Sequence, residues 1–387
     1  FGGWHDASDY LQYVTTTATT VFQMLFAYEQ NPGSFQDLHH ANGLPGANGI
    51  PDVLDEAKWG LDWLARMNPE PNVFFNQVCD DRDHRGMRMP NQDTLTYDIA
   101  GSGVRPVYRI TGAPQGLGKY KNRTTGVSSS VAKFASAFAA GARNLEKYYP
   151  DFSSAIYQKA LNAYAYALSD TGVCQTAPNR APYFYEEDNW KDDVELAAVQ
   201  LAKTDSDNRY VSDAVRYGKM EGNSHWMGTD TATHYQWFPF INYGHIELAG
   251  KNDFTNSSSA FQEILRTDLQ HLADRGAKNA FNIGIPFIWC SNNYISAAAT
   301  QARLYEARTG DTRFRAMQTA LRDWLFGCNP WGTSMIIGLP NAKVGANPNG
   351  DFPVDPHSAF THQAKIQIDG GLVDGPIYSS IFGRLIG

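Results

Sequence analysis

The stretch from Ser128 to Leu145 reads SSSVAKFASAFAAGARNL, and it indicates the fold class by itself. Its large apolar residues recur three or four positions apart, which is the spacing of one face of an α-helix. They are Val131, Phe134, Phe138, Ala142 and Leu145. The serines at the start of the stretch are residues that often cap a helix N-terminus. We therefore predict a helix over 128–145, capped by Ser128 to Ser130, with one face in the core.

Helical spacing recurs along the rest of the chain. Apolar residues lie at helical intervals again after Pro51-Asp52, and Gly310 fits a helix C-cap. Further predicted helices cover roughly 8–28, 151–169, 190–204, 208–221, 235–249, 257–275, 292–309 and 311–327, with the start of another at 378–385. No run of alternating residues competes with them as strands. Successive antiparallel helices predict an all-α fold, either a toroid of helical hairpins or a helical solenoid.

The organisation of the chain favours the toroid. There is no fixed repeat period, as a solenoid would have, and no Pro- or Ser-rich linker, so residues 1–387 are predicted to form a single domain. The longer irregular segments lie at roughly 30–50, 68–127, 170–189, 222–233 and 329–376. Long loops in a helical protein are often functional, and in a toroid they would gather at one end and line a cleft.

Composition excludes several classes of function. The 387 residues carry a net charge of -8 and no basic block, which argues against a nucleic-acid surface. No stretch of about 18 apolar residues is present, so no membrane span is predicted. The four scattered cysteines form neither a disulfide scaffold nor a local zinc motif. The 9 Trp, 20 Tyr and 21 Phe suit either a large core or a groove that stacks on sugar rings.

Two carboxylates, Asp6 and Asp9, lie three residues apart in the segment Gly3-Trp4-His5-Asp6-Ala7-Ser8-Asp9-Tyr10. On a helix or its first turn they would share a face and could both point at one water molecule. The alternative is that one of them only caps the helix that follows. The segment resembles the Gly-Trp-Tyr-Asp-Ala-Gly-Asp motif of family 9 glycoside hydrolases, which are inverting, cellulase-type enzymes with an (α/α)6 barrel. Ser8 stands at one glycine of that motif.

Further segments resemble the same family in the same order. Asp83-His84 is similar to the start of its Asp-His-x-x-Trp-x-x-Pro segment, whose His contacts the sugar, although Met87 stands at the Trp position. Residues 190–198 resemble its Asp-Glu-Leu-x-x-Ala segment, where an acidic pair helps some members to hold a structural calcium ion. Asp192 and Asp193 are therefore candidate calcium ligands. The alternative is that they only complement the dipole of the helix.

The C-terminal third resembles the family as well. Residues 289–294 are similar to its Trp-Gly-Ser-x-x-Tyr motif, in which the Trp and the Tyr line the glycan cleft; the alternative is a buried Trp that fixes a loop. Residues 325–334 resemble Leu-Leu-Gly-x-Asn-Pro-x-Gly-x-Ser, and 370–376 resemble Gly-x-Leu-Val-x-Gly-Pro. In the Pro-His-His-Arg segment, His357 occupies the first His position. Ala359 occupies the Arg position, so this subsite lacks the bidentate recognition that Arg provides.

The resemblance implies an endo-β-1,4-glucanase that cleaves a β-glucan with inversion. Such a reaction needs a base and an acid about 6.5–9.5 Å apart. Asp9 would be the base, and Asp6 would hold and orient the same water. The implied sugar-binding residues are His84 and His357 for hydroxyl groups, and Trp289, Tyr294 and Trp190 as stacking platforms. No cofactor is required, and a structural calcium ion at Asp192 and Asp193 is the candidate metal.

The family's acid is a Glu in an Asn-Glu motif that follows the Gly-Pro segment. We expect it beyond Gly387, together with the last helix of the toroid. Residues 1–387 are therefore expected to be a catalytic domain truncated at both ends of a parent protein with further domains, and to be inactive and unstable alone. Because polymeric glucans lie outside the cell, we expect a secreted, periplasmic or cell-surface protein.

Several alternatives stay open at this point. A non-catalytic glycan-binding module would keep the aromatic residues but would not need paired carboxylates. A polysaccharide lyase or glucuronyl hydrolase on a similar toroid would favour a basic cleft, and an exo-acting oligosaccharide hydrolase would share the motifs. The substrate could be cellulose, mixed-linkage glucan, the xyloglucan backbone or short oligosaccharides. Met87 and Ala359 argue against crystalline cellulose.

Overall fold

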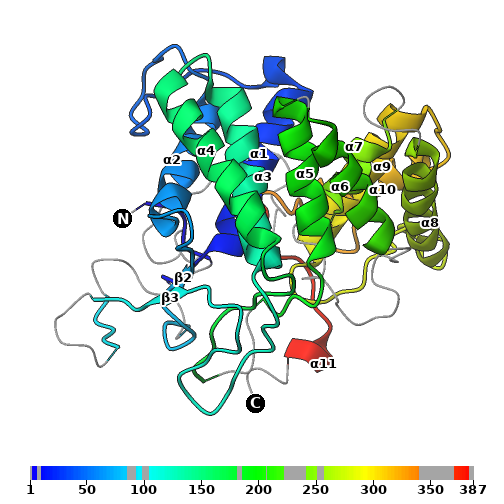
Figure 1. The fold of residues 1–387 in the computed structure, drawn as a ribbon. Coiled ribbons are helices and arrows are strands. Elements are labelled where there is room, and N and C mark those ends of the chain that lie inside the picture. The colour runs from blue at the N-terminus through cyan, green and yellow to red at the C-terminus, as the bar shows by residue number, and fades with distance from the viewer. Residues whose placement is uncertain are drawn as a thin grey trace. The chain divides into compact units, whose positions relative to one another are not determined.

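Helix α3 (Ser128–Leu145) has the predicted bounds and packs against α1 (Val14–Gln30), α2 (Asp52–Met67), α4 (Pro150–Ala167) and α5 (Lys191–Thr204) (Figure 1). The computed structural model describes residues 2–6, 10–84, 93–97, 104–180, 185–205, 207–221, 241–250, 257–339 and 370–382. Every residue from Ser128 to Ala140 is buried. Apolar side chains face helices on more than one side of α3, and their burial stabilises the first part of the chain.

The helical prediction is confirmed along the chain. The remaining helices are the short 3-10 turn Pro32–Ser34, α6 (Asn208–Glu221), α7 (Tyr243–Leu248), α8 (Ser258–Gly276), α9 (Ser291–Thr309), α10 (Arg315–Leu325) and α11 (Ser379–Phe382). Gly310 is the predicted left-handed C-cap, with φ +76°. Within the predicted helix 235–249, the described part is helical only from 243 to 248. No described helix is long and apolar enough to cross a membrane.

Contacts divide the chain into two compact units, which are described separately below. The first consists mainly of residues 1–221 and the second mainly of residues 240–387. That the chain forms one domain stays a prediction.

The sequence predicted that the serines at the start of α3 cap the helix, and this prediction is wrong. The N-cap is Val127, and no side chain bonds there. Ser128 Oγ instead donates to the Ala167 carbonyl at 2.7 Å, and Ser129 Oγ accepts from the Cys174 amide at 2.8 Å. These hydroxyls therefore attach the loop that follows α4 to the start of α3.

The first helix begins later than predicted, at Val14 instead of residue 8. A short strand, β1 (Gln12–Tyr13), precedes it and pairs antiparallel with β2 (Phe75–Val78), which pairs with β3 (Val107–Arg109). The sequence pattern did not indicate this short three-stranded sheet. The sheet connects the N-terminal segment to the loop between α2 and α3.

Asp6 consequently lies ahead of β1 and not on a helix. Its amide donates to the Leu11 carbonyl at 2.8 Å. Gly2 and Gly3 have φ +90° and +69°, a region that favours glycine, so the chain turns before it reaches Asp6. The helix-face argument for Asp6 is therefore wrong. So is the capping alternative, because the α1 N-cap is Tyr13.

Two of the long loops of the first unit pack against each other, and that they line a cleft stays a prediction. Gln77 Oε1 accepts the Ala177 amide at 2.7 Å, and Gln77 Nε2 donates to the Ala177 carbonyl at 3.2 Å. Asp81 accepts the amides of Asn179 and Arg180, each at 2.6 Å. These bonds fix the segment 77–84 against the segment 175–180.

In the second unit, two distant motifs meet at the start of α9. The Asn292 amide donates to the Asp374 carbonyl at 3.1 Å, and Asn292 Nδ2 donates to the Val373 carbonyl at 3.0 Å. Ser291 Oγ donates to the Pro376 carbonyl at 2.8 Å. The segments 289–294 and 370–376, both singled out by the sequence, therefore form one structural feature.

An ion-pair network joins α1, α3 and α5 and makes stability depend on pH. Arg143 Nη2 and Lys203 Nζ lie 2.5 and 2.9 Å from the two carboxylate oxygens of Glu29. Burial acts to raise the pKa of Glu29, but the charges of Arg143 and Lys203 outweigh it, so the pKa is lowered. Because the folded pKa is the lower one, Glu29 stabilises the fold above its unfolded pKa, and this contribution is lost as pH falls.

We expect Glu29→Gln to lower the free energy of unfolding by about 1–3 kcal/mol at neutral pH. The difference in unfolding free energy between the wild type and the variant should shrink below about pH 4.3, where the Glu29 carboxylate becomes protonated in the unfolded wild type. Urea unfolding at several pH values checks this. Glu263→Gln, which removes an exposed pair with Arg266, is the matched control and should change little. A Glu29→Gln deficit that is constant with pH would contradict the prediction.

Candidate active site

Asp6 is held by a tyrosine that sequence analysis did not identify. Tyr185 lies 179 residues away, and its hydroxyl donates to both carboxylate oxygens of Asp6, at 2.7 and 2.9 Å. Tyr185 itself has φ +53°, an uncommon value for a residue other than glycine. Its ring packs edge-to-face on Tyr13 at 5.1 Å between centroids. Backbone strain at functional sites is common, and here it orients a phenol at a motif carboxylate.

The predicted His84 loop is attached to the same segment. Asp83 is fully buried, and its Oδ1 accepts the Tyr10 amide at 2.9 Å. Its Oδ2 accepts the Tyr97 hydroxyl and lies 3.9 Å from Arg105 Nε. Burial and the bond to Asp83 raise the pKa of Tyr97, so its phenol stays a donor. His84, which is exposed, directly follows Asp83. Asp83 in turn binds the amide of Tyr10, the residue after Asp9 in the sequence.

A second buried aspartate stabilises this loop. Asp80 Oδ1 accepts Arg82 Nε at 2.8 Å, and Asp80 Oδ2 accepts Arg82 Nη2 at 2.6 Å and the Tyr108 hydroxyl at 2.5 Å. Burial acts to raise the pKa of Asp80, but Arg82 and Tyr108 outweigh it, so the pKa is lowered. The loop that ends at His84 is therefore held by charge-assisted bonds on both sides.

The structure brings Asp6 and the His84 loop together in the first unit. Asp9, the predicted base, lies outside the described residues, as do Met87, His357 and Ala359. Trp190, a predicted stacking platform, is half-buried, and its ring packs edge-to-face on Tyr217 of α6 at 5.7 Å. Its role in sugar stacking stays a prediction.

The two predicted aromatic residues of the second unit differ in exposure. Trp289 is 39% exposed, whereas Tyr294, inside the first turns of α9, is 1% exposed. Trp289 therefore has surface available for a sugar ring, and stacking by Tyr294 stays a prediction. Cys290, between them, has φ +63°. This left-handed conformation explains why a glycine suits the same position in the resembled motif.

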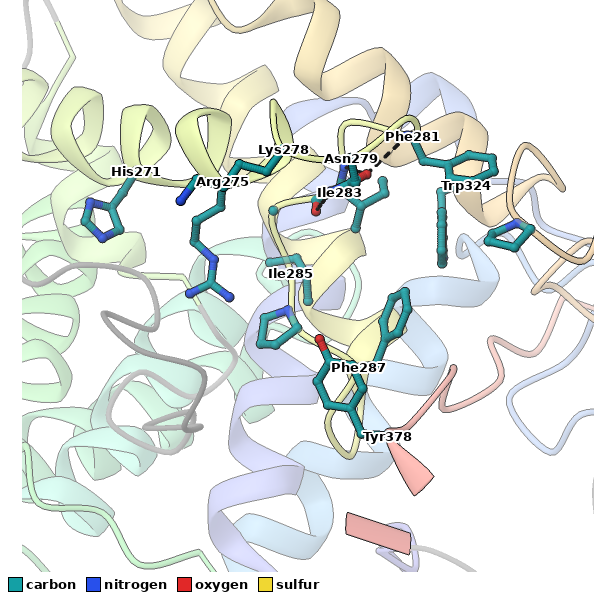
Figure 2. A pocket seen from close by; sticks show the side chains of 13 residues that line it. His271, Arg275, Lys278, Asn279, Phe281, Ile283, Ile285, Phe287, Trp324 and Tyr378 are labelled. Atoms are coloured by element: carbon teal, nitrogen blue, oxygen red, sulfur yellow. Dashed lines mark hydrogen bonds between the residues drawn. The ribbon is translucent and has the colours of Figure 1, made fainter. Parts of the chain in front are cut away.

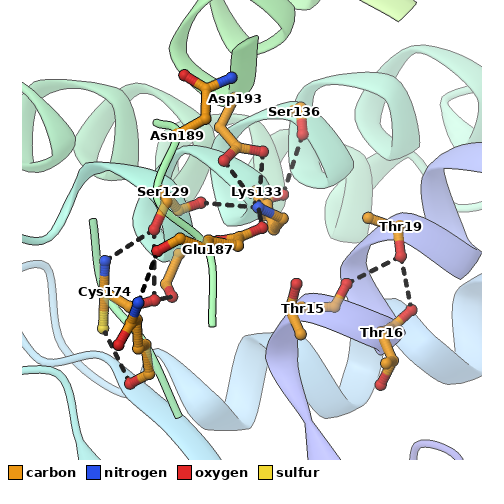
Figure 3. Close-up of polar contacts among 12 residues, drawn as sticks. Thr15, Thr16, Thr19, Ser129, Lys133, Ser136, Cys174, Glu187, Asn189 and Asp193 are labelled. Atoms are coloured by element: carbon orange, nitrogen blue, oxygen red, sulfur yellow. Dashed lines mark hydrogen bonds and ion pairs between the residues drawn. The ribbon is translucent and has the colours of Figure 1, made fainter. Parts of the chain in front are cut away.

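A buried lysine lies beside the acidic pair at the start of α5 (Figure 3). Lys133, on α3, is 3% exposed, and its Nζ lies 2.5 Å from Glu187 Oε1 and 2.7 Å from the Asp193 carboxylate. Burial acts to lower the pKa of Lys133, but the charges of Asp193 and Glu187 outweigh it and raise the pKa. The side chain is therefore an ammonium ion.

These residues do not fit a calcium ion. Calcium takes about six to eight oxygen ligands at about 2.3–2.6 Å. Among the described residues, no three His, Cys, Asp or Glu side chains that include Asp192 or Asp193 converge within 4.8 Å. The ammonium ion of Lys133 already lies between the carboxylates of Glu187 and Asp193. A calcium ion beside them would meet a positive charge.

The second unit contains a separate cavity of about 800 Å³ (Figure 2). Arg275 and Lys278 line one side, and the rings of Phe287, Trp324 and Tyr378 line another. Phe287 packs on Trp324 and Tyr378 at 5.7 and 5.6 Å between centroids. No carboxylate lines this cavity among the described residues. The described lining of this cavity therefore offers no acid or base for glycoside hydrolysis, and we assign the candidate active site to the first unit.

Comparison with known proteins agrees with the motifs. The family model of glycosyl hydrolase family 9 matches residues 1–382. Endoglucanase C of Cellulomonas fimi is 25% identical over 352 residues, which are 87% of this chain and 29% of that protein. A cellodextrinase of Butyrivibrio fibrisolvens is 24% identical over 370 residues, with 87% of this chain and 59% of that protein covered. The chain thus spans well under two thirds of the length of these relatives.

Solved structures show the same fold. A metagenome-derived glycoside hydrolase family 9 endoglucanase matches with a TM-score of 0.74 and 26% identity, over 97% of this chain and 62% of that chain. The family 9 endoglucanase J30 matches with a TM-score of 0.70 and 22% identity, over 97% of this chain and 64% of that chain. These likenesses confirm the predicted all-α fold of the (α/α)6 class.

Proposed function

Because this chain belongs to glycosyl hydrolase family 9, we propose that the whole protein hydrolyses β-1,4-glucosidic bonds of a β-glucan with inversion. This proposal rests on one observation: the Tyr185 hydroxyl donates hydrogen bonds to both carboxylate oxygens of Asp6. A glycan-binding module without catalysis would not need a carboxylate oriented in this way. Orientation by a fixed donor is what a group that positions a water requires.

In the proposed mechanism, water attacks the anomeric carbon while an acid protonates the departing oxygen. Asp9 removes the proton of the water as the general base. Asp6 accepts a hydrogen bond from the same water, because each carboxylate oxygen has two lone pairs. Two carboxylates on one water hold it on a single line of attack, which leads to inversion.

Substrate contacts are proposed for the residues that the sequence motifs identify. His84 would bind a hydroxyl of the reactive sugar, because Asp83 fixes its loop to the backbone beside Asp9. Trp289, with its exposed surface, would stack on a sugar ring, and His357, Tyr294 and Trp190 are further candidates. We propose soluble β-1,4-linked glucans or their oligosaccharides as substrates. Because such polymers lie outside cells, we also propose an extracellular or cell-surface location.

The stereochemistry of the product tests this function. We expect proton NMR of the fresh reducing end to show the α-anomer first, because one displacement at a β-linked carbon inverts it. The β-anomer should appear only at the rate of spontaneous mutarotation, measured in a blank. Initial release of the β-anomer would indicate a covalent intermediate and would overturn the proposed mechanism. No hydrolysis of any soluble β-glucan by the whole protein would overturn the function.

The role of Tyr185 predicts a specific kinetic change. We expect Tyr185→Phe to lower kcat roughly tenfold, because a hydrogen bond to a charged group contributes about 1.5–3 kcal/mol. KM should stay unchanged, since Tyr185 is a positioning residue that acts through Asp6. Steady-state kinetics on a soluble β-glucan measures both constants. Tyr157→Phe removes a similar phenol–carboxylate bond to Asp205 at the surface and is the matched control. Equal kcat values for the two variants would contradict the prediction.

A further inference from the structure

Lys133 is the single charged residue in the stretch from Ser128 to Ala142. It lies on a helix face that is otherwise apolar or small. Its ammonium group contacts Glu187, Asp193 and, at 3.4 Å, the Ser129 carbonyl. A buried ammonium ion with three oxygen neighbours resembles the centre of a cation site. The same acidic pair, Asp192 and Asp193, is where the sequence predicted a calcium ion.

The lysine also acts on the segment that carries Tyr185. The Glu187 amide donates to the Tyr185 carbonyl at 3.1 Å, so Tyr185 and Glu187 belong to one tight turn. Gln175 Nε2 donates to the Glu187 carbonyl at 2.8 Å. On the outer side, Arg123 pairs with Glu186 and Asp188, but it is half exposed and therefore held less firmly. Lys133 is thus the buried anchor of residues 185–188.

We propose that the ammonium ion of Lys133 is the built-in cation of this site, which takes the place of calcium and holds the turn that presents Tyr185 to Asp6. Lys133 is a residue of α3, so a chelator cannot remove this cation. The cation part of the proposal is independent of catalysis. The positioning part rests on the hydrolase function proposed above.

Asp192 provides the most direct test between lysine and metal. Asp192 is a candidate calcium ligand, and its Oδ1 is buried with no hydrogen-bond partner among the described residues. We expect the wild-type whole protein to contain no stoichiometric calcium by atomic emission. We also expect its melting temperature to be the same in excess EGTA and in calcium. Bound calcium that is lost in Asp192→Asn, with a melting temperature lowered by EGTA, would overturn the proposal.

The variant Lys133→Met tests the same proposal by removing the ammonium group. Methionine has a similar shape without the charge, so the buried carboxyl groups of Glu187 and Asp193 lose their cation, and they must then take up a proton or stay as uncompensated charges. We expect a fall in melting temperature of about 5–10 °C in EGTA. Calcium should change the melting temperature of neither the variant nor the wild type, because the described carboxylates that remain do not form a calcium site. Lys58→Met, which breaks a partly exposed pair with Asp62, is the matched control and should melt near the wild type.

An unchanged melting temperature for Lys133→Met would overturn the proposal. If Lys133→Met does not fold, the double variant Lys133→Met with Glu187→Gln removes one uncompensated anion. We expect this double variant to fold and to melt below the wild type. A double variant that melts like the wild type would overturn the proposal.

Kinetics test the positioning part. We expect Lys133→Met in EGTA to lower kcat several-fold on a soluble β-glucan, with KM unchanged, when it is measured well below the melting temperature of the variant. A kcat equal to that of the wild type in EGTA would refute the positioning role. A whole protein without hydrolase activity would refute the proposed function, while the calcium and melting measurements would still decide the cation part.

Discussion

Asp9→Asn should remove most β-glucan hydrolysis from the whole protein while its fold is kept. A general base typically contributes on the order of 10²–10⁴-fold in rate, and an amide cannot take the proton of the attacking water. Asn has nearly the same shape as Asp, so the melting temperature should change little. We expect kcat to fall by about 10²–10⁴-fold, measured on a soluble β-glucan.

Asp151→Asn is the control for this substitution, because Asp151 is an exposed carboxylate in the first turn of α4. It should keep wild-type kcat. Near-wild-type turnover by Asp9→Asn, with the expected fold, would show that Asp9 is not the base. In that case Asp6, already oriented by Tyr185, would be the next residue to test.

The helices could be predicted because their information is local. In 128–145, apolar residues at intervals of three and four produce a helix with bounds that match the structure. Gly310 was predictable as a C-cap, since a left-handed residue at a helix end favours glycine. These features depend on neighbours within one or two turns.

The start of the chain could not be predicted in the same way. A run of apolar residues from 10 onward suggests one long helix, but Gln12 and Tyr13 pair with residues 77–78, more than 60 positions away. Such a pairing leaves no periodic signal in two residues. The sequence motif identified Asp6 as a candidate site residue, which stays a prediction, and it placed Asp6 on a helix that begins only at Val14.

The residues that hold the candidate site in place could not be predicted from the local sequence either. Tyr185 adopts φ +53° without being Gly, Asn or Asp, so no sequence signal marks it. Lys133 did carry a signal, because a lone charge in an apolar helix must have a buried partner or a path to water. Its partners Glu187 and Asp193 are 54 and 60 residues away, and only the fold identifies them.

Asp83→Ala should reduce both stability and turnover. Asp83 is buried, accepts the Tyr10 amide and the Tyr97 hydroxyl, and lies near Arg105. Removing one partner of a buried charged network costs about 3–5 kcal/mol, which urea unfolding can measure. The freed Tyr10 amide should also let Asp9 move, and because misplacing a catalytic group by about 1 Å can cost about 10²-fold, we expect a large fall in kcat.

Asp81→Ala separates the two effects. Asp81 belongs to the same loop and is buried, but it accepts the amides of Asn179 and Arg180 instead of Tyr10. This variant should lose a comparable amount of stability, because two amides lose their acceptor. It should keep more of the wild-type kcat, since the backbone beside Asp9 keeps its bond to Asp83. An equal loss of kcat in both variants, measured well below their melting temperatures, would mean that the loop acts through general stability. A selective loss in Asp83→Ala would show that this buried carboxylate couples the His84 loop to the proposed base.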